Sequence, residues 1–130
     1  EELKKFYAGI LHEYKNKKYH IIGSLRGWED LDPQFFIQYR KDRGRANIKT
    51  KLLLTHDSRK DNPTDPALRR DVRYLPVKYQ FKSTIDIYKD KILIVSPELS
   101  SLAVVIQIPA MTDIFGSVFH ILWENIGLKT

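Results

Sequence analysis

The chain has 130 residues, 42% hydrophobic and 29% charged, which is the composition of one globular domain. It contains no cysteine, which excludes disulfides, thiolate-bound zinc, iron–sulfur clusters and a cysteine nucleophile. Lysine and arginine outnumber aspartate and glutamate by 22 to 16, and this excess favours an anionic partner. No apolar run has the roughly 20 residues of a membrane span. We therefore expect no membrane partner. The absence of cysteine fits a reducing compartment, and we expect a cytoplasmic location.

The first half of the sequence alternates helices and strands. Apolar spacing and turn residues predict a helix over 2–14, a strand over 19–24, a loop over 23–27, a helix from 33 to about 44 and a strand over 48–55. The pair Asp32-Pro33 marks the start of the second helix, because aspartate is a common N-cap and proline fits the first helical position. Helices between these strands predict parallel crossovers.

The second half is richer in strands. The predicted elements are a loop over 56–66, a short helix over 66–70, strands over 73–76, 83–88, 92–95 and 102–108, and a helix over 111–126 that stops at Gly127. The turn Lys89-Asp90 predicts an antiparallel hairpin, with one face of the 83–88 strand exposed. The sequence thus predicts a single α/β domain over residues 1–130, a mixed sheet with helices on both faces, in which 1–15 is a candidate linker or dimerisation helix.

Ligands of such sheets bind beyond the carboxyl ends of the parallel strands, here residues 23–28 and 55–58. The candidate ligand-binding residues are Ser24, Arg26, Trp28, His56, Arg73, Ser83 and Asp86. The two arginines would bind an anion or hydroxyl groups, and the aspartate would accept hydrogen bonds from hydroxyls. Trp28 would stack on a ring, or would instead pack over the next helix.

A second candidate surface is the basic stretch between Arg40 and Lys51. It carries six basic residues and one acid, and its candidate nucleic-acid contacts are Arg40, Arg43, Arg45, Lys49 and Lys51. The alternative is a solvated helix end followed by a strand rim. The four histidines lack metal-ligand spacing and no glycine-rich phosphate loop is present, so we expect no metal and no cofactor.

Several segments resemble a known family. Residues 73–76, 83–96, 104–109, 115–119 and 122–124 together resemble the C-terminal, phospholipase-D-like domain of TrmB-type transcriptional regulators. The resemblance implies a domain that senses a small effector, sugar-like or anionic, and that acts as a homodimer. It also implies that DNA is bound through a winged helix-turn-helix that would precede these residues in the full protein.

The same resemblance argues against catalysis. Active phospholipase-D-like enzymes carry His-x-Lys-x-x-x-x-Asp on the hairpin, and the aligned positions here are Phe81, Ser83 and Tyr88. Phenylalanine offers no nucleophile and serine no positive charge, so the resemblance predicts a domain that is not an enzyme. Three alternatives stay open at this point: a nucleic-acid-binding module, a residual phosphodiesterase and a purely structural dimerisation domain.

Overall fold

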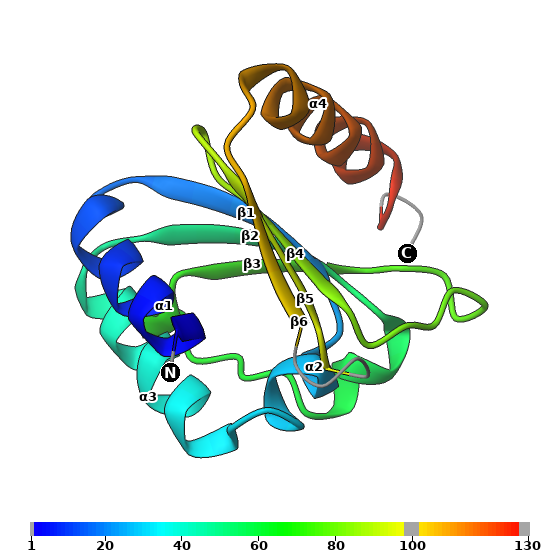
Figure 1. Cartoon of the computed structure of the whole chain (residues 1–130). Coiled ribbons are helices and arrows are strands. Elements are labelled where there is room, and N and C mark those ends of the chain that lie inside the picture. The colour runs from blue at the N-terminus through cyan, green and yellow to red at the C-terminus, as the bar shows by residue number, and fades with distance from the viewer. Residues whose placement is uncertain (1, 98–101, 128–130) are drawn as a thin grey trace.

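The computed structural model describes residues 2–97 and 102–127 and shows a sheet between two layers of helices (Figure 1). The helices are α1 (Glu2–Glu13), α2 (Leu25–Glu29), α3 (Pro33–Arg45) and α4 (Pro109–Asn125), with two 3-10 helices, η1 (His56–Lys60) and η2 (Pro66–Leu68). The strands are β1 (Lys18–Gly23), β2 (Lys49–Leu54), β3 (Arg70–Tyr74), β4 (Thr84–Ile87), β5 (Ile92–Ser96) and β6 (Leu102–Ile106). The α/β class and the single-domain architecture are confirmed.

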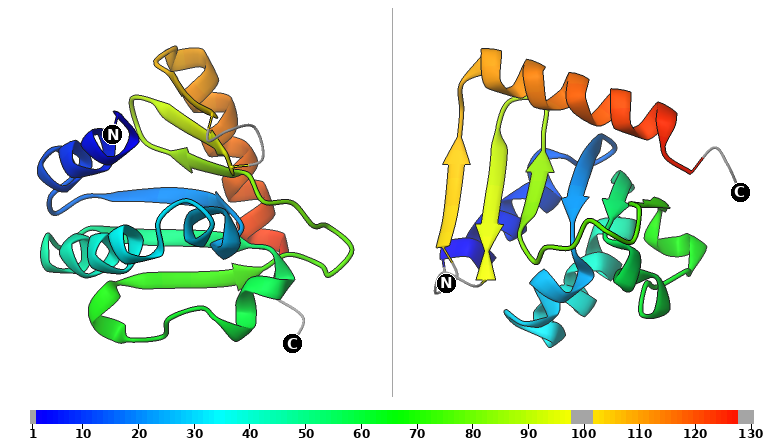
Figure 2. Two further views of the ribbon diagram at one scale, coloured as in Figure 1. Left: turned by 60° about the horizontal axis from the view of Figure 1, so that its bottom comes forward. Right: turned by 90° about the vertical axis from the view of Figure 1, so that its right-hand side faces the viewer.

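The six strands form one mixed sheet in the order β3-β2-β1-β4-β5-β6. β1, β2 and β3 are parallel, whereas β4, β5 and β6 follow as antiparallel neighbours (Figure 2). The parallel half arises because α3 and the 3-10 helices carry the chain back between strands, as the alternation of elements predicted. In the parallel register Lys18 pairs with Lys49 and His20 pairs with Lys51.

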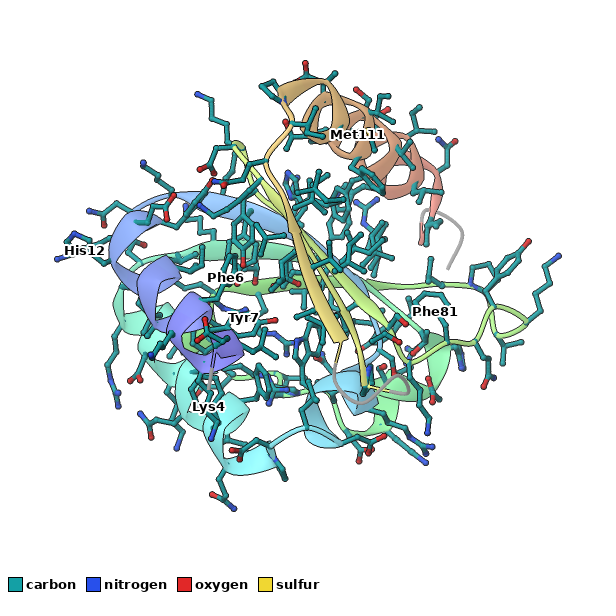
Figure 3. All side chains as sticks on the ribbon, in the orientation of Figure 1. Lys4, Phe6, Tyr7, His12, Phe81 and Met111 are labelled. Atoms are coloured by element: carbon teal, nitrogen blue, oxygen red, sulfur yellow. The ribbon has the colours of Figure 1, made fainter. Side chains whose placement is uncertain are left out.

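Helices cover both faces of the sheet, as predicted. Side chains alternate along each strand, so Ile21 and Leu52 face α1 and α3 while Ile22 and Leu53 face α4. The first core is rich in aromatic rings, and Figure 3 shows where α1 contributes Phe6 and Tyr7 to it. The second core is smaller and is built around α4.

Two predicted helix signals are confirmed at their residues. The Asp32 carboxylate accepts a hydrogen bond from the backbone N–H of Phe35 at 3.1 Å, which caps α3. Gly127 has φ of +78°, a left-handed conformation that suits glycine just after the last turn of α4.

Four local predictions need correction. Residues 25–29 form α2 instead of a loop, because the Ser58 hydroxyl accepts a hydrogen bond from the N–H of Leu25 at 3.0 Å. The predicted loop at 56–66 begins with η1. β3 begins at Arg70 and ends at Tyr74, before Pro76, which has no N–H to donate to a ladder. β4 has no exposed face, because α1 and α3 cover its polar side.

Candidate functional site

The carboxyl ends of β1 and β2, where a ligand was expected, are filled by hydrogen bonds within the chain. Ser24 is 1% exposed, and the Thr55 and Ser58 hydroxyls lie 3.0 Å apart beneath α2. At the surface above them, Arg26 forms a 3.7 Å ion pair with Asp57. His56 is exposed beside this pair. The expected cleft is therefore replaced by a closed strand–helix junction.

Trp28 lies in the core, which corrects the expectation that it stacks on a ligand. Its side chain is 6% exposed and contacts the ring of Phe36 across a centroid distance of 6.5 Å. Its indole N–H donates a hydrogen bond to the Tyr7 hydroxyl at 3.4 Å. Trp28 therefore packs against the next helix, which was the alternative to stacking on a ligand.

Arg73 points to the other face of the sheet. Its guanidinium lies 4.3 Å from the ring centroid of Trp123 and donates hydrogen bonds to the carbonyl oxygens of Trp123 and Ile126. These carbonyls end α4 and lack partners within the helix. Arg73 thus connects β3 to α4 and does not contact the other candidate residues.

Asp86 is buried, and the Ser83 hydroxyl forms a hydrogen bond within the chain. Asp86 is 1% exposed and accepts a hydrogen bond from the Tyr88 hydroxyl at 3.2 Å. Burial raises the pKa of Asp86 to about 7, although Arg43 and the hydroxyls of Tyr88 and Tyr7 favour the carboxylate. Ser83 donates to the Ser96 hydroxyl at 3.3 Å. A buried carboxylate of this kind cannot accept hydrogen bonds from an outside ligand.

The basic stretch does not form one surface. Arg40 and Arg43 are 9% and 4% exposed beneath α3, where Arg43 donates to the Tyr19 hydroxyl at 3.1 Å. Lys49 and Lys51 project from the opposite face of the sheet, since Lys51 lies 5.3 Å from the ring centroid of Trp123 on α4. Arg45 is exposed and pairs with Asp42 at 3.1 Å. A single nucleic acid cannot contact all five at once.

The described structure has a cavity at the opposite ends of β1 and β2. It is a groove of about 990 Å³ between the end of α1, the turn from β4 to β5 and one side of α4. The first residues of the two parallel strands, Lys18 and Lys49, line it, and α4 contributes Thr112, Asp113, Ser117 and His120. A volume of this size suits a small ligand.

Lysines outnumber acidic side chains in the lining of this groove by four to three. Its cationic side chains are Lys17, Lys18, Lys49 and Lys89, all exposed. Within residues 2–97 and 102–127, none of these four ammonium groups pairs with a carboxylate. Two of the three acids in the lining, Glu13 and Asp90, are held instead by Lys91, with N–O distances of 2.6 and 3.1 Å.

His20 forms part of the groove wall beside α4. Its ring stacks on Phe119 at a centroid distance of 4.4 Å and meets the edge of His120 at 5.1 Å. Burial lowers the pKa of His20 to about 4, and the charges of His120, Lys51 and Lys18 act in the same direction. At neutral pH His20 is therefore uncharged, and the positive charge of the groove comes from its lysines.

Sequence reasoning missed this groove. Lys18 and Lys49 are 31 positions apart, and only the parallel register brings them side by side. The signal available was a lysine at the start of each of two predicted parallel strands. In the described part of the chain no three His, Cys, Asp or Glu side chains come together as metal ligands would. None of the described helices has the length and apolar character needed to cross a membrane.

No protein-family model matches the sequence, and comparison with curated proteins finds no match. Comparison with solved structures does find a relative in fold. The fold is similar to that of TrmBL2, an archaeal chromatin protein. The match has a TM-score of 0.57 at 17% identity and covers 96% of this chain but 48% of TrmBL2, so this chain spans about half the length of that protein. The structure of TrmBL2 is described as showing a novel mode of DNA binding.

This similarity confirms the TrmB-related fold that the sequence resemblance implied. At 17% identity it is a likeness of fold. The residues of the groove are therefore interpreted from their own geometry and charge.

Proposed function

We propose that this chain is a non-catalytic regulatory domain of a DNA-associated protein and that it binds a small effector molecule in the groove at the start of β1 and β2. The groove carries the proposal, because it is large enough for a small ligand and is lined by four lysines without carboxylate partners in the described residues. The fold shared with TrmBL2, which is described as a DNA-binding chromatin protein, supports the DNA-associated role. DNA would be bound by a winged helix-turn-helix elsewhere in the full protein, and effector binding would bias its arrangement.

The positions of a phospholipase-D-like catalytic motif support a role without catalysis. Phe81 is 40% exposed in the loop before β4, at the opposite end of the molecule from His12 on α1 (Figure 3). Ser83 is hydrogen-bonded to Ser96, and Tyr88 is 2% exposed in the core. The motif's histidine nucleophile is replaced by a phenylalanine, which has no nucleophilic atom, and its lysine is replaced by an uncharged serine.

We also propose that two copies of the domain associate through β6. This strand is an edge of the sheet and pairs with β5 alone. Val104 and Val105 are 42% and 45% exposed on its two sides, and no charged residue occurs from Leu102 to Thr112. The other edge, β3, carries Arg70, Asp71 and Arg73. Charged side chains protect an edge strand from pairing, and β6 lacks that protection.

A second copy is the occupant that fits this edge best. Antiparallel pairing of β6 with its own symmetry mate joins two uncharged strands without like-charge contacts. α4 begins three residues after β6 (Figure 2). It has the exposed apolar residues Ile114, Val118 and Ile121 at helical spacing. These side chains would extend the contact beyond the paired strands.

The test of the regulatory role is a thermal-shift screen of the purified domain with sugars, sugar phosphates, nucleotides and short DNA duplexes. A saturable rise in melting temperature with a class of small molecules supports effector sensing, because a ligand that binds only the native state stabilises it. A shift with DNA alone contradicts the effector role. Turnover of bis-p-nitrophenyl phosphate above the buffer rate contradicts the non-catalytic role.

A further inference from the structure

We infer that the groove binds a small phosphorylated molecule that also carries hydroxyl groups, with Lys18 and Lys49 holding the phosphate. This inference rests on the proposed function, since it names the chemical class of the effector. It places the ligand at the amino ends of the parallel strands, opposite to the end that sheets of this kind ordinarily use.

The first observation is the pairing of like charges. Lys18 and Lys49 are direct partners in the parallel ladder of β1 and β2, so their side chains lie next to each other on the α4 face. Like charges in this position destabilise a sheet. An anion bound between the two ammonium groups turns that repulsion into two charge-assisted contacts, and lysine is a common phosphate ligand.

The second observation is the imbalance of charge around this pair. Lys17 precedes Lys18 in the turn that leads into β1, and Lys89 lines the groove from the turn that follows β4. Lys91 holds Glu13 and Asp90, and Asp90 also accepts a hydrogen bond from the Tyr14 hydroxyl at 2.5 Å. The acids closest to the lysines in the sequence are therefore already engaged by other groups.

The third observation concerns the α4 side of the groove, which is suited to hydroxyl groups. Asp113 and Ser117 are exposed there, and Asp113 forms no ion pair within the described residues. A Cβ atom added at Gly116 would meet nothing within 4 Å, so there is open space beside this residue. A carboxylate and a hydroxyl are the groups with which proteins bind polyols. The wall therefore has acceptors for the part of the ligand that bears no phosphate.

Nucleic acid carries the same phosphate chemistry, but the groove favours a small molecule. Asp113 would lie against the continuous phosphates of an extended strand and repel them. A sugar phosphate or a mononucleotide places its single charged group at the lysines and its hydroxyls at the carboxylate. The groove volume of about 990 Å³ holds a ligand of that size.

The test is calorimetric titration of the domain with glucose 6-phosphate, ribose 5-phosphate, fructose 1,6-bisphosphate and AMP, with glucose and a short DNA duplex as comparisons. We expect at least one phosphorylated probe to bind. Its affinity should fall by about tenfold or more in the double variant Lys18→Gln/Lys49→Gln, because two charged contacts are lost. The matched control Lys41→Gln/Lys60→Gln removes two exposed lysines outside the groove and should leave the affinity unchanged.

The outcomes separate this inference from the proposed function. If a phosphorylated probe binds both double variants with equal affinity, the phosphate site is overturned but effector sensing stays in place. The same conclusion follows if glucose binds the unmodified domain as tightly as the phosphorylated probe does. Binding of the duplex alone, or of no probe, overturns both. Amide chemical-shift changes in the unmodified domain provide a measurement independent of the variants. They should centre on Lys18, Lys49 and Ser117, and changes centred on Arg26 and His56 contradict the inference.

Discussion

Arg73 on β3 stacks against Trp123 on α4, with 4.3 Å between the guanidinium and the centroid of the indole ring. The same guanidinium donates hydrogen bonds to the carbonyl oxygens of Trp123 and Ile126 at the end of α4. One arginine thus places a cation at the C-terminus of α4 and connects this helix to the edge strand β3. Since α4 forms a wall of the groove, Arg73 helps to fix that wall from a distance.

The substitution Arg73→Gln should lower the free energy of unfolding by roughly 1–3 kcal/mol, because it removes a cation–π contact and a charged partner of the helix end. Urea denaturation measures this loss. The control is Arg26→Gln, whose partner Asp57 lies 3.7 Å away in an exposed pair, and such pairs contribute about 0–1 kcal/mol. Equal losses in the two variants would contradict the structural role of Arg73.

A charge reversal at Lys18 should separate stability from ligand binding. Lys18→Glu replaces a like-charge pair with a cross-strand ion pair to Lys49, so we expect the domain to gain about 0.5 kcal/mol at low salt. The same change should abolish binding of a phosphorylated probe. Denaturation at low and high salt measures the gain, which should shrink as salt screens the pair.

Lys60→Glu reverses the charge of another exposed lysine, at the end of η1 and away from the groove. It should leave the binding of the phosphorylated probe intact. If Lys18→Glu destabilises the domain at low salt, the account of the Lys18–Lys49 pair is wrong.

Half-buried His20 and buried Asp86 lie on opposite faces of the sheet, and their titrations should change the free energy of unfolding in opposite directions. The pKa of His20 is lowered from 6.5 to about 4, so the unfolded chain binds the proton more readily and stability rises with pH across this interval. The pKa of Asp86 is raised from 3.8 to about 7, so the folded chain binds the proton more readily and stability falls with pH over nearly the same interval.

Single substitutions should therefore reveal how each group makes the free energy of unfolding depend on pH. In Asp86→Asn the remaining His20 contribution should make the free energy of unfolding rise between about pH 4 and 6.5, and in His20→Gln it should fall between about pH 4 and 7. Urea denaturation over this pH range measures both, with the unmodified domain as the reference of intermediate slope. Parallel profiles for the two variants would show that these groups are not the source of the pH dependence.

Local signals in the sequence were sufficient for most of the fold. Asp32-Pro33 placed the start of α3, and the turn at Lys89-Asp90 placed the β4–β5 hairpin, since each depends on residues that are close in sequence. α2 was missed because the partner that caps it, Ser58, lies 33 residues away from Leu25. A contact of that range leaves no local pattern.

The candidate site was harder to predict, because the burial of polar residues depends on the tertiary fold. The alternation of Ile85, Asp86 and Ile87 predicts one polar face for β4, yet α1 and α3 cover that face and Asp86 is 1% exposed. In the groove, residues that look unremarkable in the sequence become a candidate site through the tertiary fold. Lys18 and Lys49 are ordinary lysines at the starts of two strands. The parallel register pairs them, and α4 closes one side of the space around them.

The proposed dimer makes a prediction at the outer edge of β6. Val104→Lys places a charge on a strand edge that is otherwise uncharged, and two such charges would meet in an antiparallel pair of identical strands. The unmodified domain should sediment as a dimer whose population rises with concentration, and the variant should sediment as a monomer. Sedimentation-velocity ultracentrifugation over a range of concentrations measures this difference.

The matched control is Val77→Lys, because Val77 is 61% exposed in the loop between β3 and β4 and lies outside β6. It introduces the same charge and should leave the dimer intact. A monomeric unmodified domain, or a dimer that persists in Val104→Lys, contradicts pairing through β6. Loss of the dimer in Val77→Lys as well would show that the effect of the added charge is not specific to β6, and this would contradict the proposed interface.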